Sequence, residues 1–389
     1  MPEAPAIAPR MALVDVKAEL LHHGVTLSPA FSSRYGEPYL AKRRAYGNSD
    51  PLEFRERLLP QELYLLPGRL VCAVTIRLDS PWLLDWSENE GFVVRQSSGD
   101  PCFPVDFPRT PAFYDSTLLS GEAVKNVVTL YGGGSLGVFA FGSCRLVDIG
   151  KPCGYCSISQ NRDLGVDFLD VISEARIEEA LSLALEDTSC PVTQVMVNGG
   201  NFPDQDRSFS HYARLARAAA RAVEVSGRDV EVHLIVYPPR DLGRLAELSD
   251  SRVGVAMNYE VCDPGLFQKY CPGKEVYGGQ EHIAAALRRA VEELGRGSVY
   301  SILVGGLEPL ESLERGLFEL AGDGVTPIVN VFHADPETPL ARHPVPDAGS
   351  IRAMGQVLQE VYQRHEFARP FYLNCGRNSI DTEAWLGLF

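Results

Sequence analysis

The sequence predicts an α/β protein built on a partial or complete (β/α) barrel of the TIM type, with parallel strands. The first observation is that, from about residue 137, short apolar runs alternate with Ala- and Leu-rich amphipathic segments. The second is that polar and glycine residues follow almost every apolar run. Buried parallel strands are continuously apolar and are joined by helical crossovers, so six such units in series predict a parallel sheet that curls into a barrel.

The elements follow one another in a regular order. The apolar runs predict six strands, at Val138–Phe141, Gln194–Val197, Glu231–Val236, Gly254–Met257, Val299–Val304 and Pro327–Phe332. The amphipathic segments between them predict helices near 173–186, 208–226, 240–248, 280–295 and 310–322.

The remaining residues flank this core, which we place at 137–345. Residues 1–136 are interrupted by Pro and Gly and are expected to form an irregular N-terminal extension that caps the barrel or forms an interface. Within it, Leu70–Leu78 is strand-like, and Gly121–Leu130 is expected to be a helix that ends at three glycines. Residues 346–389 are expected to form a short C-terminal helix and a tail.

Composition excludes several classes of protein. The 389 residues are 45% hydrophobic, which is incompatible with a disordered chain, and they carry a net charge of -15, which disfavours nucleic acid as a partner. No window approaches the ~20 apolar residues of a membrane-spanning helix. The first residues, Met-Pro-Glu-Ala-Pro, form no signal sequence, so we expect a cytoplasmic protein.

Three of the nine cysteines share one predicted loop. In a reducing compartment, cysteines serve in core packing, metal binding or catalysis. Cys144, Cys153 and Cys156 follow the first predicted strand, spaced by eight and then two residues. Three thiolates without a nearby fourth suggest a metal centre with one open position. Zinc is the rival metal, and incidental core cysteines are the remaining alternative.

This constellation resembles the radical S-adenosylmethionine (SAM) superfamily. Members hold a four-iron, four-sulfur (4Fe-4S) cluster on three cysteines after the first barrel strand, with an aromatic residue before the last one, here Tyr155. The usual spacing is three and then two residues, so the first spacing differs here.

Later segments resemble the biotin synthase and lipoyl synthase branch of that superfamily. The turn Asn198-Gly199-Gly200 stands where the family meets the methionine amino group, although Asn201 replaces the usual acidic residue. The resemblance implies that Asn258 and Glu260 contact the ribose, and that the strand with Leu303 and the following Glu308 lies near the adenine. The last predicted strand leads into Glu337-Thr338-Pro339-Leu340, which is similar to the family's Gly-Thr-Pro-Leu.

The resemblance implies an enzyme that cleaves SAM reductively and abstracts hydrogen from a small organic substrate in cofactor or natural-product biosynthesis. The step after abstraction stays open between rearrangement, C–C or C–S bond formation, and elimination. An electron donor such as flavodoxin or ferredoxin is implied as a partner. Two alternatives remain: a sulfur-inserting synthase with an auxiliary iron–sulfur cluster, and a non-catalytic zinc-binding barrel.

Other residues are ambiguous in the sequence. His333 at a strand end is either structural or a catalytic residue for proton transfer or substrate contact. Lys274 is expected to be a solvated surface lysine. We consider three residues as substrate contacts and four cysteines as ligands of an auxiliary cluster, although buried free cysteine is the default: Tyr237, Arg240 and Arg377, and Cys102, Cys262, Cys271 and Cys375.

Overall fold

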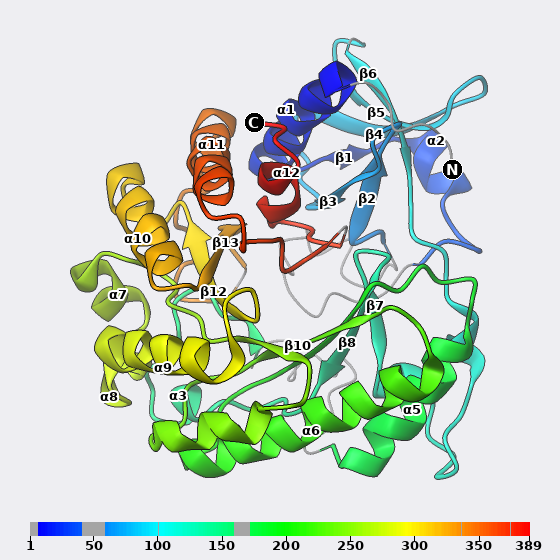
Figure 1. The fold of residues 1–389 in the computed structure, drawn as a ribbon. Helices are drawn as coiled ribbons and strands as arrows, with labels where there is room; N and C mark the ends of the chain where they lie inside the picture. Colours follow the sequence, from blue (N-terminus) through cyan, green and yellow to red (C-terminus); the bar gives the residue numbers. More distant parts are fainter. Residues whose placement is uncertain (1–6, 41–58, 100, 159–171, 336, 374) are drawn as a thin grey trace.

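The computed structural model describes residues 7–40, 59–99, 101–158, 172–335, 337–373 and 375–389, with side chains from residue 13 onward (Figure 1). Its centre is a seven-stranded sheet in which six consecutive strands are parallel and neighbours along the chain are neighbours in space. These strands are β8 (Ser135–Phe139), β9 (Gln194–Asn198), β10 (Glu231–Ile235), β11 (Val253–Ala256), β12 (Val299–Gly305) and β13 (Thr326–Val331). All six predicted strands are therefore confirmed, and they form a partial barrel of the TIM type.

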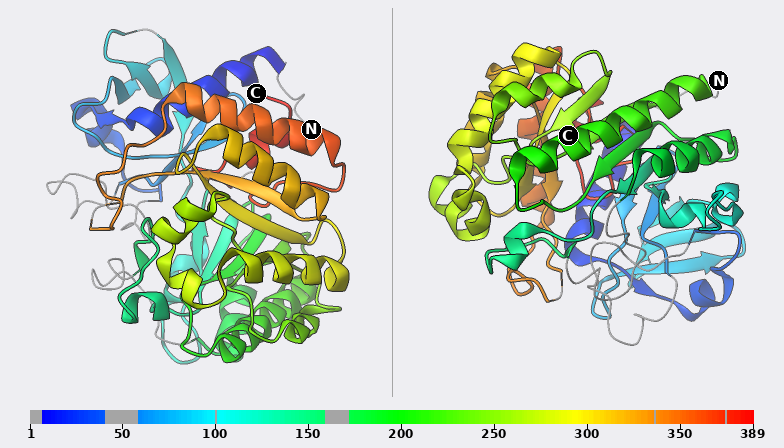
Figure 2. Two further views of the ribbon diagram at one scale, coloured as in Figure 1. Left: turned by 90° about the vertical axis from the view of Figure 1, so that its left-hand side faces the viewer. Right: turned by 90° about the horizontal axis from the view of Figure 1, so that it is seen from below.

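Helices cover the outer face of this half barrel (Figures 1 and 2). They are α5 (Glu174–Glu186), α6 (Gln205–Ser226), α9 (Gly279–Leu294), α10 (Leu310–Gly322), α11 (Ala348–Arg364) and a 3-10 helix (Leu242–Leu248). Shorter helices lie in the loops at the carboxyl ends of β8 and β11, namely α3 (Arg145–Asp148), α7 (Pro264–Tyr270) and α8 (Pro272–Val276).

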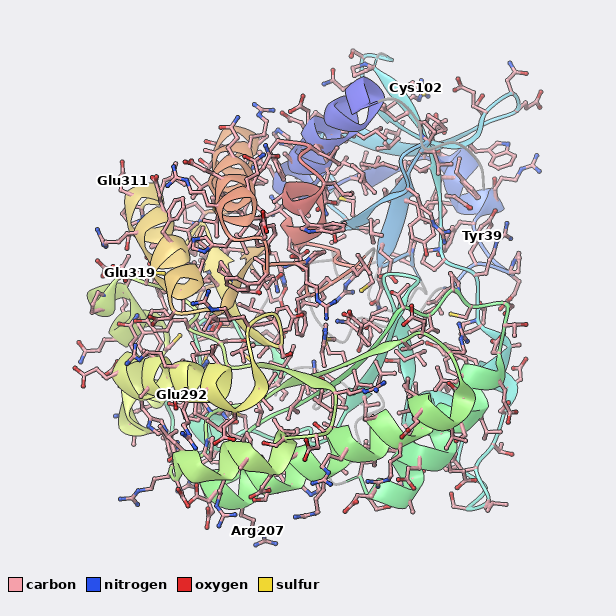
Figure 3. All side chains as sticks on the ribbon, in the orientation of Figure 1. Tyr39, Cys102, Arg207, Glu292, Glu311 and Glu319 are labelled. Carbon is pink, nitrogen blue, oxygen red and sulfur yellow. The ribbon has the colours of Figure 1, made fainter. Side chains whose placement is uncertain are left out.

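Side-chain caps and amphipathic faces explain these helices. Ser173, Asp204 and Asp347 each accept a hydrogen bond from a backbone N–H in the first turn of α5, α6 and α11. Their inward faces join the strands' outward side chains in one large apolar core. The opposite faces carry charge, as the exposed residues Arg207, Glu292, Glu311 and Glu319 in Figure 3 illustrate.

Strand alternation separates a second, smaller core on the concave face. Ile302 and Ile328 point inward with Phe371 from the C-terminal tail, whereas Leu303 and Val329 point outward to the helices. The ring of Phe371 stacks on His233, with the ring centroids 4.4 Å apart. The side chains of this smaller core fill the amino-terminal end of the half barrel, and the carboxyl end remains open to ligands.

The N-terminal region differs from the expected irregular extension. Its described residues contain a six-stranded mixed sheet in the order β1-β4-β5-β6-β2-β3, which has its own apolar core. The strands are β1 (Thr26–Leu27), β2 (Glu62–Leu65), β3 (Leu70–Ala73), β4 (Trp82–Ser87), β5 (Gly91–Gln96) and β6 (Cys102–Asp106), with helices α1 (Ile7–His23) and α2 (Pro29–Arg34) beside them. The strands are short and several are buried on both faces, so the period-two pattern that identifies a strand is missing.

The segment Gly121–Leu130 does not form the helix expected from the sequence. It holds a 3-10 turn (Val124–Asn126) and then strand β7 (Thr129–Tyr131), which pairs antiparallel with β8. The glycines after it form the β7–β8 turn instead of ending a helix. A Cβ on Gly132 would lie 2.1 Å from the carbonyl oxygen of Cys375, and one on Gly133 would lie 1.4 Å from the hydroxyl of Tyr64. Glycine is therefore required where the tail and the N-terminal sheet meet this hairpin.

The C-terminal tail closes the open side of the half barrel. At one end the hydroxyl of Thr193, at the start of β9, donates to the carbonyl of Leu373 at 3.2 Å. At the other end Val331 N donates to the carbonyl of Asn378 at 2.9 Å, on the free edge of β13. Between them the carbonyl of Arg377 accepts a 3.0 Å hydrogen bond from Ala73 N of β3. The tail thus joins the start of β9 and the free edge of β13 to the N-terminal sheet.

A buried lysine fastens this closure. Lys17 on α1 is 2% exposed and lies 2.6 Å from a carboxylate oxygen of Glu383, which belongs to α12 (Asp381–Trp385). Its Nζ also donates to the carbonyl of Ser379 at 2.7 Å. Burial raises the pKa of Glu383, although the lysine acts against this shift. None of the helices in the described parts of the chain is long and apolar enough to cross a bilayer.

Substituting this lysine tests the closure. Lys17→Met should lower the free energy of unfolding by about 3–5 kcal/mol at neutral pH, because it leaves a buried carboxylate without its partner. The measurement is urea unfolding followed by tryptophan fluorescence. The double variant Lys17→Met/Glu383→Leu removes both charges and should recover most of the loss. Equal stability of Lys17→Met and the wild type would contradict a structural role for the pair.

Candidate functional site

A cavity of about 350 Å³ lies at the carboxyl ends of the parallel strands and extends into the half barrel. The cysteine loop after β8 forms one wall, and the loops after β9, β11 and β13 form others. The C-terminal tail lines the far side with Tyr372, Cys375 and Arg377. The cavity is where ligands bind in barrels of parallel strands.

A glycine turn holds the cysteine loop against β9. A Cβ on Gly200 would lie 1.8 Å from the carbonyl oxygen of Ser143 and 3.0 Å from Cα of Cys144, so only glycine permits this approach. Gly200 N donates to the carbonyl of Phe141 at 2.9 Å, and Arg145 N donates to the carbonyl of Asn201 at 2.8 Å. The turn that follows β9 therefore fixes the position of the first cysteine.

The three loop cysteines line this cavity and interact electrostatically. Burial raises the pKa of Cys144 and Cys156, and the neighbouring Cys153 thiolate raises both further. The pKa of Cys153 is lowered instead, because a hydrogen bond from Cys271 and the charge of Lys274 outweigh burial. The site thus favours at least one thiolate, the form that binds metal.

Two asparagine side chains present buried acceptors that have no hydrogen-bond partner. They are Oδ1 of Asn198 at the end of β9 and Oδ1 of Asn258 after β11, and both residues line the cavity. A buried unsatisfied acceptor costs about 1–3 kcal/mol. A bound ligand that offers N–H or O–H groups at these two positions would remove that cost.

A buried ion pair stands beside these acceptors. Lys274 on α8 is 7% exposed and forms an ion pair with Glu260, while its Nζ also donates to the carbonyl of Asn258 at 3.2 Å. Burial acts to lower the pKa of Lys274, but the negative charge of Glu260, with the nearby sulfurs of Cys153 and Cys271, prevails and raises it. The expectation of a solvated surface lysine is wrong, because α8 folds back under the cysteine loop.

A hydrogen-bonded group links the cysteine loop to the end of β13. The hydroxyl of Ser157 donates to one carboxylate oxygen of Asp335 at 2.7 Å, and Nδ1 of His333 lies 2.8 Å from the other. Asp335 is 1% exposed, whereas the His333 side chain is 41% exposed and lines the cavity. Asp335 therefore fixes the imidazole and leaves Nε2 as the nitrogen for a ligand.

The inner end of the cavity, inside the half barrel, is mainly apolar. Met196, Ile235 and Ile302 line it from the strands. Asn330 on β13 adds a third Oδ1 that is buried without a hydrogen-bond partner. Asn330 was not among the site residues predicted from the sequence, although it is the one polar side chain in the apolar run Pro327–Phe332. Arg377 lies over the ring of Tyr131, 5.3 Å from its centroid, and Nη1 donates to Gln61 at 3.2 Å.

The structure gathers ten of the twelve predicted site residues around this cavity. They are Cys144, Cys153, Tyr155, Cys156, Asn198, Gly199, Gly200, Asn258, Glu260 and His333. Leu303 is not among them, because strand alternation turns it outward, and Ile302 and Val304 line the cavity in its place. Of the predicted substrate contacts, Tyr237 and Arg377 line the cavity, whereas Arg240 is exposed outside it.

Glu308 has a structural position outside the cavity. Its carboxylate accepts hydrogen bonds from the backbone N–H groups of Cys262 and Asp263 at 2.8 and 2.9 Å, and from the hydroxyl of Ser312 at 2.7 Å. Glu308 therefore ties the loop after β12 to the loop after β11. The expected contact with a cofactor does not agree with this position.

The three loop cysteines fit an iron–sulfur cluster. In a 4Fe-4S cluster each thiolate binds a different iron, so three cysteines that line one cavity are a suitable donor set. The unpartnered acceptors and the buried Glu260 then surround the space next to the cysteines.

The other cysteines considered as ligands do not gather in one place. Cys102 lies in the N-terminal sheet, at the top right of the view, whereas helix α3 of the cysteine loop lies at the lower left (Figures 1 and 3). Cys262 packs against Gly316 of α10, and Cys375 donates to Gln194 at 3.4 Å in the inner core. Cys271 is fully buried beside Tyr155, at 3.6 Å from its hydroxyl.

Comparison with known proteins gives partial matches. No family model matches the sequence. The chain is 24% identical over 257 residues to bacteriochlorophyllide c C-7(1)-hydroxylase of Chlorobaculum limnaeum, and this match covers 61% of the chain and 64% of that protein. The chain therefore matches less than two thirds of that relative's length.

Among solved structures, the chain is similar to HydG, described as a maturase of the [FeFe]-hydrogenase, with a TM-score of 0.45 and 12% identity over 63% of this chain and 53% of that one. A second HydG, from Carboxydothermus hydrogenoformans, has a TM-score of 0.43 and 15% identity, and the match covers 66% of this chain and 60% of that one. A radical SAM methyltransferase from Sphaerobacter thermophilus has a TM-score of 0.41 and 15% identity, and the match covers 74% of this chain and 76% of that one. At these scores the structural similarity is partial.

Substitution of Glu308 separates a structural role from a role in binding. Glu308→Ala should lower the free energy of unfolding by about 2–4 kcal/mol, because three hydrogen bonds to a carboxylate are lost. Glu308→Gln keeps one acceptor oxygen and should lose less. Urea unfolding measures stability, and isothermal titration calorimetry measures the affinity for SAM, which should change little. Lost SAM affinity at unchanged stability would instead support a cofactor contact.

Proposed function

We propose that this protein is a radical SAM enzyme that holds a 4Fe-4S cluster on Cys144, Cys153 and Cys156 and acts on a small organic substrate. The observation that carries the proposal is the single cavity in which three cysteines face two unpartnered asparagine acceptors and a buried ion pair. The relationship to a hydroxylase supports an enzymatic role for the region that matches.

The donor groups of SAM suit the polar residues of the cavity. Its amino group and ribose hydroxyls are hydrogen-bond donors, and Oδ1 of Asn198 and Oδ1 of Asn258 are acceptors without partners. Glu260 is a carboxylate acceptor for a hydroxyl, and its ion pair with Lys274 orients it. Cys144, Cys153 and Cys156 would hold the cluster, which would supply the electron for reductive cleavage of SAM to methionine and the 5′-deoxyadenosyl radical that abstracts hydrogen from the substrate.

The chain's own residues then protect and orient the reactants. The apolar side chains of Met196, Ile235 and Ile302 line the inner end of the cavity and keep water from the radical. The tail closes the open side of the barrel by its bonds to β9 and β13. Asn330 and Arg377 are our candidates for substrate contacts, and His333, held by Asp335, is the candidate for moving a proton. A flavodoxin or ferredoxin would supply the electron.

Iron content and SAM cleavage test the proposal. After anaerobic reconstitution the protein should hold about four irons per chain and form 5′-deoxyadenosine from SAM and dithionite. The variant Cys153→Ala/Cys156→Ala should lose both properties, whereas Cys190→Ala, which replaces a buried cysteine outside the cavity, should keep them. Markedly more iron would support the sulfur-inserting alternative. Bound zinc with no iron and no cleavage would support the zinc-binding barrel.

The asparagine acceptor near the predicted ribose position gives a second test. Asn258→Leu should weaken SAM binding about fivefold, because one hydrogen bond to a buried acceptor contributes about 1 kcal/mol. Leu303→Met is the matched control, since this residue faces the helices, and should leave the dissociation constant unchanged. Calorimetry on the reconstituted protein measures both. If Leu303→Met weakened SAM binding and Asn258→Leu left it unchanged, our assignment of the two residues would be reversed.

A further inference from the structure

Arg377 is held in one orientation in the part of the cavity wall that the C-terminal tail forms. Its Nη1 donates to Oε1 of Gln61 at 3.2 Å and lies 3.7 Å from Oε2 of Glu62. The guanidinium lies over the ring of Tyr131, 5.3 Å from its centroid. Glu62 is itself fixed, because its Oε1 accepts a hydrogen bond from Gly132 N at 2.9 Å. The N-terminal sheet and the β7–β8 hairpin therefore position this arginine.

These contacts leave one edge of the guanidinium unused. Nη1 faces Gln61 and Glu62, whereas Nε and Nη2 have no hydrogen-bond partner in the part of the chain that the structure describes. Nε and Nη2 together form the edge that binds a carboxylate side-on, and Arg95 uses the same two nitrogens toward Asp85. The Arg377 side chain is 18% exposed and lines the cavity, so a ligand there can reach this edge.

Arg377 is also the cation of the cavity wall that lacks a hydrogen-bonded carboxylate. The other lysine or arginine among the described lining residues is Lys274, which forms an ion pair with Glu260. His333 lies 2.8 Å from a carboxylate oxygen of Asp335. An anionic group that enters the cavity therefore gains most by binding Arg377.

The surroundings of Arg377 select the kind of anion. Glu62 is 2% exposed and does not line the cavity, and its negative charge offsets part of the charge of the guanidinium. One partly compensated guanidinium with one unused edge suits the single charge and the planar shape of a carboxylate. A phosphate dianion would require further cations, which the described wall does not offer.

A polar acceptor lies on the same face as Arg377. Ser379 of the tail bridges antiparallel to Asn330 of β13, and alternation puts Arg377, two residues before Ser379, on the face of Asn330. Oδ1 of Asn330 is buried without a hydrogen-bond partner, so it can accept from a hydroxyl or an amino group. The strands supply apolar side chains at this inner end of the cavity.

We propose that the substrate is a small organic acid, whose carboxylate binds Nε and Nη2 of Arg377 and whose hydroxyl or amino group donates to Asn330. This inference rests on the proposed function and names the class of substrate for its site. The rest of the substrate is apolar, because Met196, Ile235 and Ile302 line the inner end of the cavity. The tail therefore anchors the substrate as well as closing the barrel.

The reconstituted wild-type protein with bound SAM gives the first test. Ligand-observed NMR titration measures its affinity for hydroxy acids with apolar bodies (leucate, mandelate and phenyllactate) and for their neutral carboxamides. The acids should bind at least about tenfold more tightly than the carboxamides, because hydrogen bonds between charged groups contribute more than neutral ones. No preference for the acid in any of the three pairs would overturn the proposal.

Variants test the assignment to Arg377. Arg377→Met should weaken acid binding about ten- to hundredfold, and Arg377→Lys, which keeps the charge without the planar fork, should lose less. Arg240→Met replaces an exposed arginine outside the cavity and is the matched control, which should bind as the wild type does. Asn330→Leu should weaken the binding of phenyllactate but not that of phenylpropionate, which lacks the hydroxyl.

The outcomes separate this inference from the proposed function. Absence of a cluster and of SAM cleavage would overturn the proposed function, and the substrate class with it. Acid binding that is equal in Arg377→Met and the wild type would overturn the substrate class alone. Weaker SAM binding in Arg377→Met would do the same, because the guanidinium would then bind the carboxylate of SAM. If Arg377→Met does not fold, the preference of the wild type for acids and the affinity of Arg377→Lys decide.

Discussion

The structure depends on the incomplete curl of its parallel sheet. Six parallel strands form only part of a barrel, so two edges and an inner face remain to be covered. Strand β7 pairs with one edge, and Ser379 of the tail bridges to Asn330 on the other. The N-terminal sheet and α1 then hold the tail in place, through Ala73 and through the buried Lys17–Glu383 pair. The C-terminal tail is therefore part of the cavity wall, and the N-terminal sheet and α1 hold it there.

This closure explains why the polar groups of the cavity are sparse and clustered. Inside the half barrel the strands contribute mostly apolar side chains, and water-free burial makes every polar atom costly unless it is paired. Glu260 is tolerated because Lys274 neutralises it, and Asp335 because Ser157 and His333 bind it. The asparagine oxygens of Asn198, Asn258 and Asn330 are the exceptions. Unpaired acceptors at one site are expected where a ligand supplies the missing donors.

The sequence was sufficient for the barrel and for most of the site, since the strands are continuously apolar and their ends carry polar residues. It was insufficient where the deciding interaction is tertiary. Leu303 lies one position from a cavity residue, and only the register of β12 decides which face it takes. Lys274 and Glu308 are polar residues in loops, and no local pattern shows that α8 buries the first or that backbone N–H groups occupy the second. The N-terminal strands lack alternation because the apolar core of the N-terminal sheet covers both faces of several of them.

The unusual cysteine spacing allows the cysteine loop to pack on the segment that joins α7 to α8, which we call the α7–α8 joint. The eight residues between Cys144 and Cys153 include the helical turn α3, whose Leu146 packs against Gly273 of α8. A spacing of three residues would leave no room for this turn, and the loop would then lack its contact with the α7–α8 joint. The longer loop reaches that joint, and the contact sets Cys153 beside Cys271 and Lys274. The departure from the usual spacing therefore places the second cysteine near the positive charge of Lys274.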